Sequence, residues 1–318
     1  MIAYPKAVSL SRKALILGQQ KAEQKDDMEI AVHIGASCTD DERLIKSLLK
    51  NADSFAQQGV IVPQPNRYRR LLRETMHNLQ GQVPAEETRD ILVDAILEDQ
   101  EGHRVVLSNP DFICVPNRIF EGGEFYALAA AKAQTLRDLF PRDQVSLYIG
   151  IRNPATFLPE ALKASKAETL DDFMRGARLD QVRWSDVIER LLDNAPGIPV
   201  TVWCNEDTPF LWAQLIREVS GVDPMTRITG GFDLLQTIMS REGMHRFLAY
   251  IKSHPPQTEA KKRKVIATFL ERFALEDQIV EDIEIEGWTD DMVEHITAAY
   301  EDDLELIAQM PGVKFIQP

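Results

Sequence analysis

The loop at residues 35–42, Gly-Ala-Ser-Cys-Thr-Asp-Asp-Glu, holds the residue types best suited to chemistry. It follows an apolar run at residues 30–34 and precedes a helical pattern. A loop in that place can bind phosphate, because its backbone N–H groups and the positive end of the helix dipole both point toward the anion. Here Asp40, Asp41 and Glu42 occupy the helix start. The dipole stabilises each carboxylate there by about 0.3–1 kcal/mol, so the chain itself supplies the negative charge that a phosphate would bring.

Two common nucleotide-binding motifs are missing from this loop. A phosphate loop of the form G-x-x-x-x-G-K-[ST] would need glycine in place of Asp40, lysine in place of Asp41, and serine or threonine in place of Glu42. A dinucleotide fingerprint would need glycine in place of Ser37 and of Asp40. The loop at Gly35 therefore has the position of a phosphate site without its usual side chains.

The polar residues of the loop have structural interpretations as well. Thr39, followed three residues later by Glu42, predicts a capping box at the helix start. The three acids could bind a divalent ion, but consecutive helical residues diverge by about 100° each, which favours capping. Cys38 before a helix could be an activated thiolate; the neighbouring acids raise its pKa, which favours a packed thiol.

Arg152 is the best candidate outside the loop. It leaves the carboxyl end of a predicted strand at residues 145–151, and open α/β sheets bind ligands at that edge. An ion pair with Glu160 two turns along would explain Arg152 equally well. The same crevice is expected to include four polar residues that follow the predicted strand at 103–107, namely Ser108, Asn109, Asp111 and Glu121.

The elements that position these residues alternate between strands and helices. The predicted strands cover residues 30–34, 60–62, 103–107, 145–151 and 198–204. Amphipathic helical patterns lie between them, including one that begins at Thr39, ends at Gly59, and has Leu44, Leu48 and Phe55 on one stripe. This alternation predicts a parallel sheet with helices on both faces, a three-layer α/β fold. His33 lies within the first apolar strand and is predicted to be a hydrogen-bonded core histidine.

No strand pattern follows Gly221. Residues 232–251, 261–273 and 289–310 have helical periodicity, and acidic residues crowd the segment 276–305. Most of those acids are expected to form a solvated face, with docking of a basic protein partner as the alternative. We therefore predict an N-terminal arm at residues 1–27, an α/β domain at 28–221 and a helical C-terminal region at 222–318.

Composition restricts the function classes. A net charge of −14 over 318 residues disfavours nucleic-acid binding, which needs clustered lysine and arginine. The three cysteines, Cys38, Cys114 and Cys204, fit neither a disulfide framework nor a zinc pattern, which indicates a reducing compartment. No run approaches the roughly 20 apolar residues of a membrane span. We expect a soluble cytoplasmic protein with no membrane partner.

The order His-Ile-Gly, short loop, helix with a late Asn, then Gly-Val-x-x-Pro resembles the opening of bacterial sulfotransferase-like proteins of P-loop-type fold. The matching positions are His33, Ile34, Gly35, Thr39, Leu48, Asn51, Asp53, Gly59, Val60 and Pro63. Residues 147–162 resemble the block that in this family holds the 3′-phosphate of the donor 3′-phosphoadenosine 5′-phosphosulfate (PAPS), and residues 179–207 match more weakly. The resemblance implies that Gly35, Thr39 and Arg152 are donor-binding residues. It leaves the C-terminal third unmatched.

The departures from the family pattern fall on its functional positions. The family lysine that holds the phosphosulfate corresponds to Cys38, the glycine to Asp40, and two hydroxyl residues to Asp41 and Glu42. In the second block the family serine corresponds to Glu160. A charge-assisted hydrogen bond to phosphate contributes about 1.5–3 kcal/mol. Losing the lysine and two hydroxyls therefore reduces the free energy of phosphate binding by roughly several kcal/mol.

Two functions follow from this comparison. The first is a sulfotransferase-like protein with a degenerate PAPS site, non-catalytic or acting on an unknown ligand, with no certain cofactor and no metal. The alternative is an active sulfotransferase that moves a sulfuryl group from PAPS to an unknown acceptor, with no identified catalytic base. Either protein would take a small anion or an acceptor in the crevice at the carboxyl ends of the strands.

Overall fold

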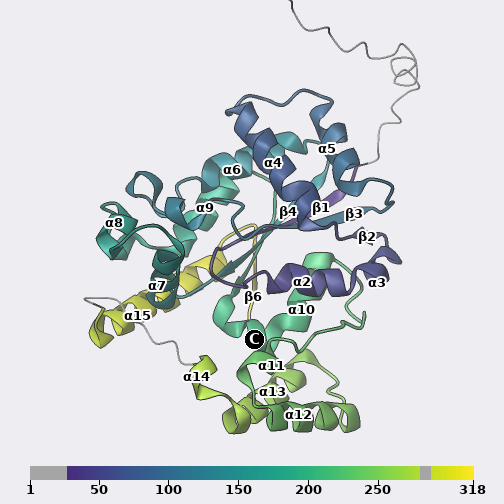
Figure 1. Cartoon of the computed structure of the whole chain (residues 1–318), viewed down its shortest axis with the longest axis vertical. Helices are drawn as coiled ribbons and strands as arrows, with labels where there is room; N and C mark the ends of the chain where they lie inside the picture. Colours follow the sequence, from purple (N-terminus) through teal and green to yellow (C-terminus); the bar gives the residue numbers. More distant parts are fainter. Residues whose placement is uncertain (1–26, 280–287) are drawn as a thin grey trace, which may run out of the picture.

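The computed structural model describes residues 27–279 and 288–318 and shows a parallel sheet between two layers of helices (Figure 1). The sheet has six strands in the order β2-β3-β1-β4-β5-β6, and every neighbouring pair is parallel. The strands are β1 (Glu29–Gly35), β2 (Val60–Ile61), β3 (Arg104–Ser108), β4 (Gln144–Ile151), β5 (Val200–Cys204) and β6 (Val313–Ile316). This arrangement confirms the predicted three-layer α/β class.

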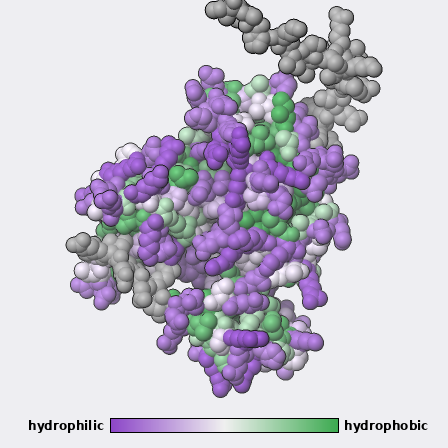
Figure 2. Space-filling model, in the orientation of Figure 1, coloured by the Kyte–Doolittle hydropathy of each residue, from purple (hydrophilic) through white to green (hydrophobic). Residues whose placement is uncertain are grey.

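The two helical layers bury opposite faces of the sheet. One face packs against α4 (Pro65–Leu79), α5 (Thr88–Leu97), α6 (Ala129–Leu139), α7 (Pro154–Ala164), α8 (Leu170–Met174), α9 (Trp184–Asn194) and α15 (Asp290–Gln309). The other packs against α2 (Arg43–Lys50), α3 (Ala52–Ala56) and α10 (Thr208–Ser220). Because successive side chains of a strand point to opposite faces, Ile30 and Val32 join the first core and Ala31 joins the second. Hydrophilic residues cover most of the visible surface (Figure 2).

The helix predicted to run from Thr39 to Gly59 begins later and is interrupted at Asn51. Its two parts, α2 and α3, keep the predicted stripe, since Leu44, Leu48 and Phe55 are buried. The Asn51 amide donates to the carbonyl of Ser47 at 2.8 Å and to that of Thr229 at 3.0 Å, and its oxygen accepts from Thr229 N at 2.8 Å. Asn51 thus ends α2 and fastens it to a distant segment.

The prediction that no strand follows Gly221 is wrong. β6 pairs with β5 from Val200↔Val313 to Trp203↔Ile316 and extends the sheet by one strand. The signal is a short Val-Lys-Phe-Ile run that comes directly after a long acidic helix, so it is hard to separate from a helix end. Residues after 221 therefore contribute to the sheet as well as to helices; the predicted domain limits stay a prediction.

The remaining helices form a small cluster of their own. They are α11 (Leu235–Ile238), α12 (Arg241–Ser253), α13 (Glu259–Phe273) and α14 (Glu276–Ile279), at the lower end of Figure 1. The helix predicted at 232–251 is divided, because Ser240 begins α12 by accepting from Gly243 N at 3.2 Å. Phe247 and Ile266 are buried at the centre of this cluster. Short 3-10 turns lie at Pro116–Arg118 (η1), Glu121–Gly123 (η2), Leu179–Gln181 (η3) and Asn205–Asp207 (η4).

Two predicted features fall partly or wholly outside the described residues. The N-terminal arm lies outside them except for Asp27, and so does the part of the acidic segment at residues 280–287. Within the described residues, no helix combines the length and apolar character that crossing a bilayer requires.

Candidate functional site

The loop between β1 and α2 is held by its own side chains. The Thr39 hydroxyl donates to the carbonyl of Ala36 at 2.6 Å. A carboxylate oxygen of Asp40 accepts from the backbone N–H of Leu44 at 2.9 Å, in the first turn of α2. The predicted capping box of Thr39 and Glu42 is therefore wrong: Asp40 caps the helix, and Thr39 turns back toward the strand.

Glu42 binds a cation rather than the helix backbone. Both of its carboxylate oxygens accept from the Arg69 guanidinium, each at 2.8 Å, in a bidentate pair. Arg69 comes from α4 and also donates to the carbonyl of Ser108 at 2.8 Å, at the end of β3. This pair fastens the start of α2 to α4 and β3.

Asp41 differs from its two neighbours. Its side chain is 72% exposed and lies 3.6 Å from the Arg43 guanidinium. The three consecutive acids thus point to three different surroundings, although they precede α2 and the φ values of Asp41 and Glu42, 48° and 64°, are left-handed rather than helical. Among the described residues, no group of three potential ligands is arranged to hold a metal ion.

Gly35 is required where the strand meets the loop. Its φ is 123°, a value that side chains rarely allow, and an added Cβ would lie 2.5 Å from the carbonyl oxygen of Pro110. The loop therefore runs directly against the segment that follows β3. This close approach explains the glycine without a ligand; its role in binding stays a prediction.

Arg152 follows β4 and lies against the loop. The side chain is buried, donates from Nη1 to the carbonyl of Cys38 at 2.8 Å and from Nε to the Thr156 hydroxyl at 3.1 Å. Glu160 forms an ion pair with Lys163 at 2.9 Å; its pairing with Arg152 stays a prediction. The structure thus brings Gly35, Thr39 and Arg152 together around one loop, where Arg152 binds protein atoms.

Cys38 has the properties of a packed thiol. Burial raises its pKa to about 11, the nearby Arg152 charge opposes that rise, and Glu160 and Asp111 add to it. The pKa is raised as the sequence predicted, with burial as the larger cause. At neutral pH the side chain is not a thiolate.

His33 lies beneath the loop, fully buried in β1. Its Nδ1 and the Ser108 hydroxyl are 2.9 Å apart, and its ring stacks on Trp203 with centroids 5.8 Å apart. Burial lowers the pKa of His33, partly opposed by the charge of Asp40. The predicted core histidine is confirmed, although its buried Nε2 has no hydrogen-bond partner among the described residues.

Helix α15 adds residues that the sequence did not indicate. Its Thr297 accepts from the Asn153 amide at 2.9 Å, immediately after β4. Glu206, after β5, accepts from Asn153 N at 2.7 Å and from the Tyr300 hydroxyl at 3.4 Å, and burial raises the pKa of Glu206. The long sequence separation hides these contacts, so a helical pattern alone could not place α15 beside the carboxyl ends of β4 and β5.

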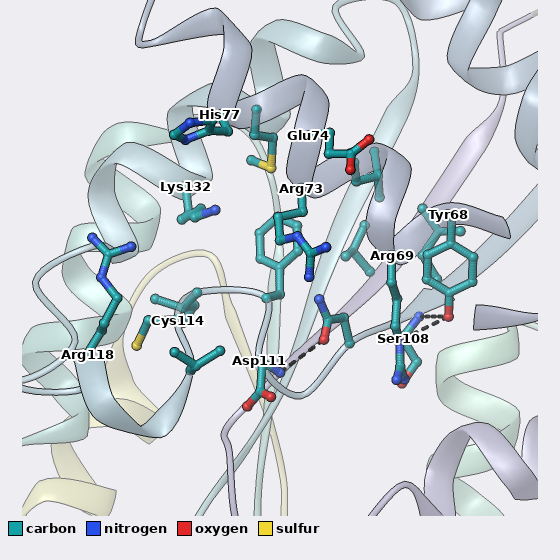
Figure 3. A pocket seen from close by; sticks show the side chains of 18 of the residues that line it. Tyr68, Arg69, Arg73, Glu74, His77, Ser108, Asp111, Cys114, Arg118 and Lys132 are labelled. Atoms are coloured by element: carbon teal, nitrogen blue, oxygen red, sulfur yellow. Dashed lines mark hydrogen bonds between the residues drawn. The ribbon is translucent and has the colours of Figure 1, made fainter. Parts of the chain in front are cut away.

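A cavity of about 670 Å³ opens between α4 and the segment that follows β3 (Figure 3). Ser108, Asn109 and Asp111 line it, as predicted, whereas Glu121 does not. Asp111 accepts from the Ser37 hydroxyl at 2.8 Å, which joins the cavity to the loop of β1. Burial raises the pKa of Asp111.

The cavity has a cationic rim that the sequence did not reveal. Four cationic side chains line it against two carboxylates: Arg69, Arg73, Arg118 and Lys132 against Glu74 and Asp111. They come from α4, η1 and α6, which are far apart in the chain. In the sequence, the only indication of these cations is a helical pattern rich in arginine at residues 67–73.

No family model and no curated protein matches the chain. Among solved structures it is similar to a sulfotransferase from Alicyclobacillus acidocaldarius, with 13% sequence identity and a TM-score of 0.37 over 74% of this chain and 95% of that one. At this level of similarity the superposition assigns no role to any residue.

Proposed function

We propose that the chain is a sulfotransferase-like protein that does not use PAPS and acts by binding rather than by sulfuryl transfer. The observation that carries the proposal is the carboxylate of Asp40 at the start of α2, 2.9 Å from the N–H of Leu44. A phosphate at a helix N-terminus would take those N–H groups. Asp40 occupies that position with a charge of the same sign.

The other groups suited to phosphate also have internal partners. Arg152 donates to Cys38 and Thr156, and the Thr39 hydroxyl donates to Ala36. Arg69, which reaches the helix start from α4, is held by both oxygens of Glu42. A charge-assisted hydrogen bond contributes about 1.5–3 kcal/mol, so a phosphate would have to replace several such bonds without the lysine that the family pattern places at Cys38.

Four substitutions test the proposal: Cys38→Lys, Asp40→Gly, Asp41→Thr and Glu42→Thr in one variant. They restore the side chains of the family loop and free Arg69 from its carboxylate. We expect this variant to bind 3′-phosphoadenosine 5′-phosphate (PAP) in a calorimetric titration, while the unchanged protein does not.

A variant with Asp41→Thr alone is the matched control, because Asp41 is exposed and its loss leaves the cap and the Arg69 pair intact. It should behave like the unchanged protein. If the fourfold variant folds, as judged by circular dichroism, and still fails to bind PAP, the assignment of this loop as a closed phosphate site is wrong.

A further inference from the structure

Apolar side chains form part of the wall of the cavity between α4 and the segment after β3. Its lining includes Val32 and Leu107 from the sheet, Leu72 and Met76 from α4, and Phe112, Ile113 and Val115 from the following segment. Val115 is 47% exposed although it lies against this cavity. A void of about 670 Å³ with such walls is in the size range of small-molecule sites.

Two of the four cations at this cavity lack a counter-charge. Arg69 is paired with Glu42, and Arg118 donates to Glu121 at 2.5 and 3.1 Å. For Arg73 and Lys132, by contrast, no ion pair or hydrogen bond is formed within residues 27–279 and 288–318. Arg73 is exposed and Lys132 is half-buried, so two cations without a counter-charge line one cavity.

Lys132 is the more constrained of the two. It is half-buried, its ammonium lies 6.0 Å from the centroid of the Phe112 ring, and burial together with Arg118 lowers its pKa. A partly desolvated ammonium without a carboxylate is costly unless an anion joins it. Figure 3 shows Arg73 and Lys132 extending from α4 and α6 toward the same space.

We propose that this cavity binds an amphipathic anion, with a sulfate, phosphate or carboxylate head between Lys132 and Arg73 and an apolar body against Leu72, Met76 and Phe112. The inference names a ligand class for the binding function proposed above and rests on it. The two cations select an anionic head group. The apolar side chains favour a ligand with an apolar body over a purely inorganic ion. The two lining carboxylates, Glu74 and Asp111, disfavour a polyanion.

Calorimetric titration with octyl sulfate, below the concentration at which it forms micelles, tests the proposal. Inorganic sulfate and octanol separate the contributions of the head and of the body. We expect octyl sulfate to bind at least about tenfold more tightly than either, since one charge-assisted hydrogen bond or two buried methylenes each correspond to about that factor. Octyl phosphate should behave like octyl sulfate.

Lys132→Met and Arg73→Gln remove the charges with little change in volume. Each substitution is expected to weaken the binding of octyl sulfate by about tenfold and to leave the affinity for octanol unchanged. Arg67→Gln is the matched control on α4, because Arg67 pairs with Glu98 at 2.9 Å and neither of the two residues lines the cavity. Val115→Glu, at an exposed position of the lining, adds a repelling charge without disturbing the core. It should reduce the affinity for octyl sulfate more than the affinity for octanol.

Three results would overturn the proposal: no binding of octyl sulfate, equal binding of inorganic sulfate, or equal loss of affinity in the Arg67→Gln control. Binding of PAP by the unchanged protein would refute the closed donor loop while leaving the octyl sulfate result intact, so the two failures are distinguishable.

Discussion

Asp40→Ala removes the carboxylate that occupies the start of α2. In the structure one oxygen of Asp40 accepts from Leu44 N at 2.9 Å, and the residue is 9% exposed. The second oxygen is buried and has no hydrogen-bond partner in the part of the chain that the structure describes. The substitution therefore removes a helix cap and leaves an N–H group without its acceptor.

The expected loss of stability follows from those contacts. Removing a side-chain cap costs about 0.5–2 kcal/mol, and the interaction of the carboxylate with the helix dipole adds about 0.3–1 kcal/mol. The buried, unpartnered second oxygen of Asp40 carries a desolvation penalty that the alanine variant no longer bears. We expect a net decrease of about 1–2 kcal/mol in the free energy of unfolding, measured by urea denaturation.

Sulfate should partly restore the stability of Asp40→Ala, because it can occupy the vacated position at the helix start. A site with a Kd of about 10 mM in about 100 mM sulfate contributes about 1.4 kcal/mol. Sodium chloride at equal ionic strength is the reference, and the unchanged protein controls for the general effect of sulfate on folding.

Asp41→Ala is the matched control for this experiment, since its side chain is 72% exposed. It should change the free energy of unfolding by no more than about 0.5 kcal/mol. If the Asp40 variant is as stable as the Asp41 variant, or gains nothing from sulfate beyond what the unchanged protein gains, then Asp40 does not stand in for an anion.

Two further predictions concern buried charges. Asp143→Ala should lower the free energy of unfolding by about 3–5 kcal/mol, since both Asp143 oxygens accept from Arg89 and both side chains are buried; Arg70→Gln, which alters an exposed pair, should cost less than about 1 kcal/mol in the same urea assay. Burial lowers the pKa of His33, so below about pH 6.5 the unfolded chain binds a proton that the folded chain does not. The free energy of unfolding therefore decreases as the pH is lowered. His33→Gln should flatten that fall between about pH 7.5 and pH 5.5; an unchanged slope would show that His33 is not its source.

The class of fold could be predicted because the strands and helices have local patterns. The apolar runs that became β1, β3, β4 and β5 are buried on both faces, as a central parallel sheet requires. β6 was missed because a four-residue strand carries little pattern and takes its place only by pairing with β5.

The candidate site was harder to predict because its contacts join distant segments. Glu42 and Arg69 are 27 residues apart, and nothing in either segment indicates that they pair. Thr39 and Glu42 have the correct spacing for a capping box. In the structure, however, Thr39 donates to the carbonyl of Ala36 and Glu42 accepts from Arg69. Sequence spacing gives the set of local hydrogen bonds that are available, and tertiary contacts decide which of them form.

Titration of the unchanged protein with PAP tests the central claim most directly. We expect no heat of binding up to millimolar nucleotide. Asp40 occupies the helix start, Glu42 binds Arg69, and Arg152 donates to the carbonyl of Cys38. Micromolar binding of PAP, abolished by Arg152→Met, would contradict the account and show that the loop opens to a phosphate.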